Sequence, residues 1–454
     1  MMRSGAELTT GSIGKKVIGF AGPIILTNLI QAIYGLVDMV TVGHFVGASG
    51  MSAVSMGAQI MTVVLVLVNG LSNGGSIVSA QLAGQGKRKE LQPVFGTMLT
   101  FFLIASILVT SAGMLLARPL LRVINTPEAA FEQAVQYLLI CMGGTIFVYG
   151  YNSMAALLRG VGDSKAPMVI VIITVILNAV LDVLLIAVFR LGVVGAALAT
   201  VICQGVSLIL VALYIKFKTD FFDFRLQSFR IHKRYLSLVL KIGLPQAIQF
   251  LFASSSFVFM SGLVNIYGVD ASAAAGAAAK IQMLANVPAQ GMMAGLMTVT
   301  AQNLAVGQPK RVMEGFRTGA AFVTAIGLVI FAVCMAFPQA VFRIFTPEAA
   351  VVEIGIAYLR CMAFSFVLES VMFCMFGIIS GSGHTPVTMC CGILSAFAVR
   401  YGCAWLLSQV FMLGFNGIGI AYNGGPVVTS LICVVFLLSG KWKTARITVN
   451  KEEN

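Results

Sequence analysis

The sequence contains few charged residues. Only 10% of its 454 residues are Asp, Glu, Lys or Arg and 59% are hydrophobic, whereas about 25% of residues are charged in an ordinary soluble domain. This scarcity excludes a soluble globular protein. The apolar residues form long runs, such as that from Met168 to Phe189, which as a helix would be about 33 Å long and match the roughly 30 Å core of a bilayer. The sequence therefore predicts an all-α polytopic membrane protein.

Motifs for several kinds of catalytic chemistry are also missing. The sequence has no GxxxxGK[ST] phosphate loop, no DDxxD and no HExxH, which argues against an ATPase, a prenyltransferase and a metalloprotease. Its nine cysteines lie in apolar stretches without metal-ligand spacing, so we interpret them as small buried hydrophobes. We expect neither an enzyme nor a bound cofactor.

Several short motifs occur twice, in the same order, about 220 residues apart. TPEAA at 126–130 returns at 346–350, SAQLAGQGKR resembles TAQNLAVGQPKR, and RGVGDSKAPM resembles SGSGHTPVTM. Because a unit of six helices ends on the side where it began, the two copies should run in the same direction. We expect twelve transmembrane helices in two parallel-repeat six-helix lobes with a cleft between them. They span roughly 16–44, 51–80, 94–117, 133–158, 166–189, 191–216, 236–266, 272–304, 315–337, 353–379, 386–412 and 415–439.

The basic residues set the expected orientation. The net charge is +13, and 22 of the 29 lysines and arginines fall in the segments on the side of the N-terminus, against five on the other side. By the positive-inside rule both termini are cytoplasmic in a cell membrane, and the basicity does not indicate nucleic-acid binding. No cleavable signal is expected, because the first apolar run is too long for one. We expect a first lobe over 1–216, an interfacial linker over 217–235, a second lobe over 236–440 and a tail over 441–454.

Three acidic residues lie within predicted spans: Asp38, Asp182 and Glu369. A charge at the centre of a membrane helix costs at least about 2.5 kcal/mol, so such residues are functional hypotheses by default. The repeat does not explain them, because Asp182 maps near Cys403 and Glu369 maps to Val148. The acids therefore favour the passage of an ion or a proton.

The acid of the fifth predicted helix has a polar neighbour. Asn178 precedes Asp182 by four residues, which places both on one helix face. Carboxylate, carboxamide and hydroxyl oxygens suit Na⁺, and a buried carboxylate can instead take a proton. Whether Asp38 lies near Asp182 is a tertiary question that periodicity does not answer.

Across nearly the whole chain, the sequence resembles the multidrug and toxic compound extrusion (MATE) transporters. The likeness rests on Pro23 followed by Tyr34 and Asp38, AQLAGQG after the second helix, LRGVGDS at 158–164, Asn178 with Asp182, and KIGLPQAIQ at 241–249. The resemblance implies two lobes arranged in a V, a central cavity that opens alternately to either side, and export of amphipathic, often cationic compounds against Na⁺ or H⁺ entry.

The resemblance also implies roles for individual residues. Family members with an ion site in the first lobe carry the cation, whether H⁺ or a Na⁺ metal ion, at the positions that match Asp38, Asn178, Asp182 and Thr200; the positions that match Tyr34 and Asn152 lie beside it. The sequence departs from the branch with a second-lobe site, because the acid expected in the seventh helix is Ala253 here. A coupling site in the second lobe is therefore not expected.

Further residues are candidates for the substrate cavity. Glu369 could contact a cationic substrate, and glutamines, asparagines and flexible methionines suit a promiscuous pocket, although they could also serve packing and contacts between helices. Lys280 and Arg400 are the basic residues within spans, and each could pair with Glu369 or extend toward the interface. The candidates are Glu369, Gln246, Gln249, Met292 and Met293, with Asn286 and Gln290 nearby.

We therefore predict a monomeric, cation-coupled secondary antiporter that lies in the lipid bilayer and exports amphipathic, cationic organic compounds or drugs by alternating access. A lipid-linked oligosaccharide flippase of the same broad superfamily is the alternative. It would favour a cationic cavity, whereas acids occupy the conspicuous positions here. A membrane-embedded enzyme is the remaining alternative, and it would require clustered catalytic residues.

Overall fold

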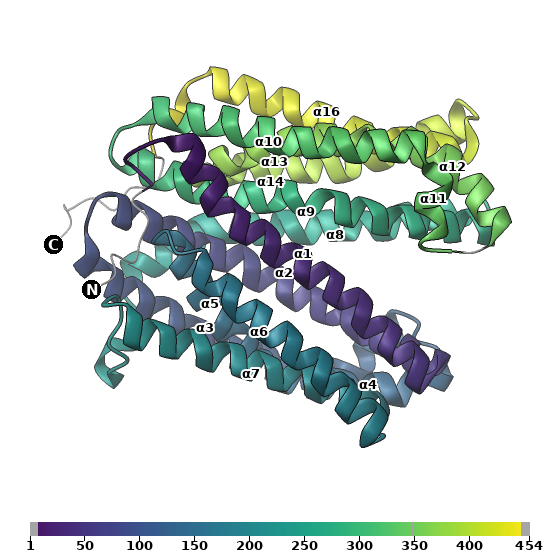
Figure 1. Cartoon of the computed structure of the whole chain (residues 1–454), viewed down its shortest axis with the longest axis horizontal. Helices are drawn as coiled ribbons and strands as arrows, with labels where there is room; N and C mark the ends of the chain where they lie inside the picture. The colour runs from purple at the N-terminus through teal and green to yellow at the C-terminus, as the bar shows by residue number, and fades with distance from the viewer. Residues whose placement is uncertain (1–7, 347, 446–454) are drawn as a thin grey trace. The chain divides into compact units, whose positions relative to one another are not determined.

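A computed structural model describes residues 8–346 and 348–445, without the side chains of residues 36–40, 48, 257 and 258. The described chain folds into helices joined by short loops (Figure 1). It forms two compact units. The first contains Leu26–Ala247 and the second contains Leu8–Ile25 and Ile248 onward.

The helices of the first half follow the predicted apolar runs. Helix α2 packs against α4 and α5, and α6 packs against α7. The segment after α6 has π-helical geometry, labelled η2. The bounds are α1 Ile13–Val46, α2 Ala48–Gly84, η1 Arg88–Glu90, α3 Leu91–Val123, α4 Glu128–Gly143, α5 Thr145–Gly160, α6 Lys165–Asp182, η2 Val183–Val188 and α7 Gly192–Lys218.

The second half repeats this order after a linker that contains one short helical turn. Helix α13 packs against α9, α10 and α16 (Figure 1), and η4 and η5 are again π-helical. The bounds are η3 Leu226–Ser228, α8 Lys233–Asn265, α9 Val269–Ala305, α10 Pro309–Ala336, α11 Pro338–Arg343, α12 Ala349–Ala363, α13 Ser365–Gly381, α14 Thr385–Ile393, η4 Leu394–Tyr401, α15 Gly402–Trp405, η5 Leu406–Val410, α16 Gly414–Leu438 and η6 Lys441–Lys443.

The described helices confirm a multi-pass membrane protein. Ten of them are long and apolar enough to cross a bilayer, and the pair α4 and α5, bent by 47°, makes an eleventh. The remaining predicted span corresponds to α9, whose 37 residues suffice in length. It is less apolar because it carries Gln282, Asn286, Gln302 and Asn303, all of them buried. Protein neighbours rather than lipid surround these polar side chains.

Glycines allow the closest helix crossings, and the same crossing occurs in both halves. A Cβ at Gly160 would lie 2.4 Å from the carbonyl oxygen of Ser76, and one at Gly381 would lie 2.4 Å from that of Met297. The partners are separated by the repeat spacing, as are the two glycines. Small residues at such positions let helix backbones approach within a membrane.

A second pair of glycine contacts sets the composition of the two units. In the first unit, Gly70 and Gly74 of α2 pack directly against the backbone of the first part of α8, at Ala247 and Val239. In the second unit, Gly291 of α9 packs in the same manner against Ile25 of α1. The first parts of α1 and α8 therefore pack in the units that hold the other half of the chain.

The string GLSNG at 70–74 matches the GxSxG motif of hydrolases. It lies inside α2, however, so it lacks the strand-to-helix turn that holds a hydrolase nucleophile.

Candidate functional site

Asp182 lies at the end of α6, where the helix changes from α-helical to π-helical geometry. Its side chain is only 2% exposed, and η2 continues the same span to Val188. Single π-helical turns within α-helices are frequent at functional sites. A carboxyl group thus lies deep inside a membrane-spanning segment, as the sequence predicts.

Asn178 lies one turn before Asp182 and is also buried, with 3% exposed. The thiol of Cys203 on α7 lies close to both side chains. Neither amide atom of Asn178 has a hydrogen-bond partner of standard geometry among the described residues. A buried amide without partners costs about 1–3 kcal/mol, and its oxygen can act as a ligand for a cation.

The other first-unit candidates lie on α1, α5 and α7. Thr200 is half-buried on α7, one turn before Cys203 and therefore on the face that approaches Asp182. Tyr34 on α1 and Asn152 on α5 are half-buried, and the Asn152 amide donates to the carbonyl of Val148 at 2.8 Å. Asp38 belongs to α1, but its side chain lies outside the described part of the structure. The structure thus places Asn178, Asp182 and the Thr200 face of α7 together.

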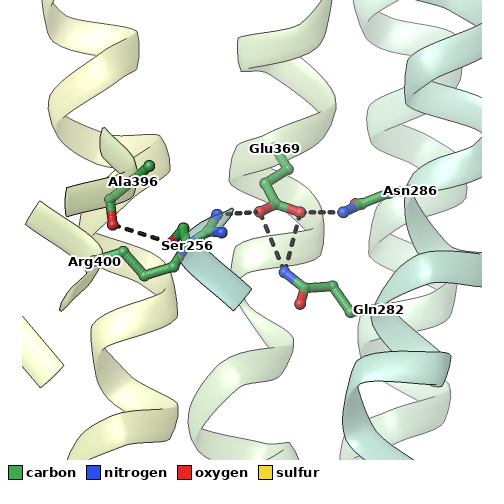
Figure 2. A network of polar contacts seen from close by, with 6 residues as sticks. All are labelled: Ser256, Gln282, Asn286, Glu369, Ala396 and Arg400. Carbon is green, nitrogen blue, oxygen red and sulfur yellow. Dashed lines mark hydrogen bonds and ion pairs between the residues drawn. The ribbon is translucent and has the colours of Figure 1, made fainter. Parts of the chain in front are cut away.

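A second polar cluster lies inside the second unit, around Glu369 of α13 (Figure 2). This side chain is 2% exposed. Two carboxamides of α9 donate to its carboxylate: Asn286 Nδ2 to Oε2 at 2.5 Å, and Gln282 Nε2 to Oε1 at 3.3 Å. Spaced four residues apart, they approach the carboxylate from one helix face.

Arg400 completes this cluster from the π-helical segment η4 (Figure 2). Its Nη2 lies 3.6 Å from Glu369 Oε1, and its guanidinium lies over the Tyr422 ring, 5.4 Å from the centroid. Of the two basic residues within spans, Arg400 therefore pairs with Glu369, whereas Lys280 is exposed. A buried carboxylate with a basic partner and two amide donors is fully compensated.

A cavity of about 200 Å³ adjoins this cluster. Of the predicted substrate-cavity residues, Glu369 and Gln249 line it, as do Asn286 and Gln290. Gln246 belongs to the first unit. Met292 and Met293 are not among the lining residues and lie in buried apolar clusters on α9.

Gln282 and Thr429 also line the cavity, although neither was predicted from the sequence. A signal for Gln282 was present, because Gln282, Asn286 and Gln290 recur every four residues and so form a polar stripe on α9. No sequence pattern indicated Thr429, since single threonines are common in apolar helices.

Comparison with known proteins gives matches to one family over most of the chain. The sequence model of the MatE family matches residues 23–184 and 245–406. The chain is 29% identical to the probable multidrug resistance protein YpnP of Bacillus subtilis, over 98% of this chain and 99% of that protein. It is 27% identical to the probable multidrug resistance protein NorM of Thermotoga maritima, over 95% and 93%.

A solved structure matches the fold over almost the full length. It is described as the outward-facing conformation of a multidrug resistance MATE family transporter of the MOP superfamily. The TM-score is 0.92, with 98% of this chain and 99% of that chain covered and 24% of residues identical. The two chains therefore share a fold.

Proposed function

The chain belongs to the MatE family of multidrug and toxic compound extrusion transporters, and from this premise we propose that it is an antiporter that exports amphipathic, cationic organic compounds against entry of Na⁺ or H⁺. The family is one of transporters and not of enzymes. The relatives named as multidrug resistance proteins support drugs as substrates, and their bacterial origin supports the cell membrane as the location.

The observation that carries the proposal is the buried pair Asn178 and Asp182 in a membrane-spanning helix. An acid at that depth is costly, and among the described residues the neighbouring amide has no hydrogen-bond partner of standard geometry. A cation bound between them compensates both groups. Thr200 adds a hydroxyl oxygen from α7, and Asp38, Tyr34 and Asn152 complete the proposed coupling site.

The coupling follows from electrostatics. A cation from outside removes one negative charge from the proposed site of Asp38 and Asp182, and this change in charge lets α1 repack. This favours release of the exported compound, and loss of the cation to the cytoplasm resets the site. The cycle requires that the cation bind the two conformations with different affinities.

The available energy is sufficient. Moving one charge through 100 mV yields about 2.3 kcal/mol. Since about 1.36 kcal/mol corresponds to a factor of ten, an exchange that moves one net positive charge inward supports a concentration ratio of roughly fiftyfold. For an exported compound with a single positive charge, this requires that two cations enter for each compound that leaves. ATP is not needed.

The test is efflux of ethidium, a fluorescent organic cation, from proteoliposomes under an imposed Na⁺ or pH gradient. We expect one of the two gradients to drive export by the wild-type protein. Asp182→Asn and Asp38→Asn should each reduce that gradient-driven rate by at least about tenfold, since each removes a carboxylate that holds the cation.

Asp270→Asn is the matched control, because Asp270 is an exposed acid in the first turn of α9. It should transport at the wild-type rate. Wild-type rates in both Asp38→Asn and Asp182→Asn, under the gradient that drives the unmodified protein, would overturn the proposed coupling site.

A further inference from the structure

The cavity in the second unit is small and has polar and apolar walls. Its volume of about 200 Å³ lies below the roughly 300–1,000 Å³ of sites for drug-sized ligands. Its polar lining comprises Glu369, Arg400 and the carboxamides of α9, and its apolar lining includes Phe250, Met372, Phe373 and Phe376. The site therefore suits a small compound, or one end of a larger one, with a polar head and an apolar body.

The charge of the cavity restricts the charge of its ligand. Among the described residues that line it, the ionisable ones are Glu369 and Arg400, a carboxylate and a guanidinium that neutralise each other. A simple cation would leave a net positive charge buried, and a simple anion a net negative one, and both are unfavourable in a low-dielectric interior. A ligand with no net charge preserves the balance.

Several buried oxygen atoms around Glu369 are acceptors without a hydrogen-bond donor among the described residues. Gln282 Oε1, Asn286 Oδ1 and Thr429 Oγ1 are buried and have no hydrogen-bond partner within the described part of the chain. The two carboxamides already donate their N–H groups to Glu369, so their oxygens remain as acceptors beside the carboxylate. Glu369, Gln282 and Asn286 together offer three acceptors, the number of donors on a primary ammonium group.

Arg400 offers the complementary group. Its distance of 3.6 Å from Glu369 exceeds the roughly 2.7–2.9 Å of a charge-assisted hydrogen bond. The two groups are thus close enough to balance charge without a direct hydrogen bond. A guanidinium binds a carboxylate through two parallel N–H donors, so an anionic group can contact Arg400 while an ammonium group contacts Glu369.

We propose that this cavity is a binding site for small zwitterionic compounds, with the ammonium group held by Glu369, Gln282 and Asn286 and the anionic group held by Arg400. The aromatic and methionine side chains pack against the apolar body. The site is distinct from the coupling site around Asp182, and binding to it is measured without an ion gradient, so it can be tested whether or not the proposed coupling is correct.

Three probes with the same ring separate the alternatives: phenylalanine, its cationic analogue phenethylamine, and its anionic analogue 3-phenylpropionate. In phenylalanine both charges sit on one carbon, close together like those of Glu369 and Arg400. Isothermal titration calorimetry of the full-length protein in lipid nanodiscs at neutral pH should give phenylalanine an affinity at least about tenfold above both analogues. Equal or tighter binding of phenethylamine, or binding of none of the probes, overturns the proposal.

Variants that change the charge of the cavity should change the order of affinity among the three probes. Arg400→Gln leaves Glu369 alone, so phenethylamine should become the tightest probe. Glu369→Gln leaves Arg400 alone and should favour 3-phenylpropionate. Lys280→Gln removes an exposed charge from α9 and should keep the wild-type order.

The double variant Glu369→Gln/Arg400→Gln is a control for misfolding of the single variants, because it leaves no unpaired buried charge. Phenylalanine should then bind at least about tenfold more weakly than to the wild-type protein, since neither of its charged groups meets an opposite charge. A purely structural role for the pair would lower thermal stability without reordering the probes. An unchanged affinity for phenylalanine in the double variant contradicts the proposal.

Discussion

Buried carboxyl groups occur in both units, but their surroundings differ. Glu369 has Arg400 at 3.6 Å and two carboxamide donors, so its charge is compensated by the protein itself. Asp182 lies beside Asn178 and Cys203, and the amide oxygen of Asn178 can act as a ligand for a cation. The first arrangement suits a permanent ion pair and the second suits a visiting cation. This difference at the level of single residues underlies both proposals.

The ion pair predicts a large stability loss when one partner is removed. Arg400→Gln leaves the Glu369 carboxylate buried without its counter-charge, which should cost about 3–5 kcal/mol. Glu369→Gln should cost a similar amount. Thermal unfolding of the purified protein, followed by intrinsic fluorescence, measures both effects, and the double variant should recover much of the loss.

The exposed pair Arg118 and Glu132 is the matched control. Its atoms are closer, at 2.8 Å, but its side chains are 55% and 64% exposed. Solvent screening should limit the cost of Arg118→Gln to below about 1 kcal/mol. If Arg118→Gln destabilises the protein as much as Arg400→Gln, burial is not what gives the second-unit pair its importance.

Among the elements, corresponding helices of the two halves both contain π-helical segments. In the first half η2 follows directly after Asp182, and in the second half η4 contains Arg400. A π-helical turn widens the helix and shifts the side chains that follow it. By the repeat spacing of about 220 residues, η2 corresponds to η5, whereas η4 with Arg400 is an additional π-helical segment of the second half.

The glycine crossings give a prediction for helix packing. Gly381→Ala would place a methyl group 2.4 Å from the Met297 carbonyl oxygen and 2.7 Å from Thr300 Cβ. Because these contacts involve backbone, α13 and α9 must separate, at a cost of about 1–3 kcal/mol. Thermal unfolding should show this loss.

Gly276→Ala is the control within α9, because a Cβ there meets nothing within 4 Å. Alanine in a helix interior should leave stability unchanged or raise it by up to about 1 kcal/mol. Equal unfolding temperatures for the two variants would contradict the packing argument.

The helices were predictable from sequence because apolar runs of membrane length have few alternative structures. The division of one predicted span into α4 and α5 could not be predicted from sequence, since the bend at Gly144 depends on packing against neighbouring helices. The family resemblance, not periodicity, indicated Thr200. The sequence offered Lys280 and Arg400 as possible partners of Glu369 but did not distinguish between them, because the contact between α13 and η4 depends on the tertiary structure.

At the scale of the whole molecule, the repeat in sequence and the compact units divide the chain differently. The first unit ends at Ala247, inside α8, and residues Leu8–Ile25 pack in the second unit. The predicted lobes, 1–216 and 236–440 with a linker over 217–235 and a tail over 441–454, stay a prediction about repeats. Pro23 lies near the point where α1 passes from one unit to the other, which favours α1 as a moving element.

The start of the described chain should loosen when its anchor is removed. Arg311 donates to the carbonyl oxygens of Gly11 and Leu8, at 2.9 and 3.4 Å, and to Asn303 Oδ1 at 3.2 Å. Arg311→Ala should raise hydrogen exchange across residues 8–16 by on the order of tenfold, since a hydrogen bond from a charged group contributes about 1.5–3 kcal/mol.

Arg317→Ala removes an exposed arginine from the same helix and should leave that exchange unchanged. Mass spectrometry of peptides from both variants makes the comparison. Unaltered exchange in Arg311→Ala would mean that apolar packing alone holds this segment.

In the proposed mechanism, Asp38 and Asp182 bind the ion whose entry drives export. The most direct measurement reverses the coupling: a gradient of ethidium is imposed across proteoliposomes without an ion gradient, and movement of Na⁺ and H⁺ is recorded. We predict that the wild-type protein moves one of these ions against ethidium and that Asp182→Asn binds ethidium without moving either. Ion movement by Asp182→Asn at the wild-type rate, or none by the wild-type protein while ethidium crosses, would contradict the claim.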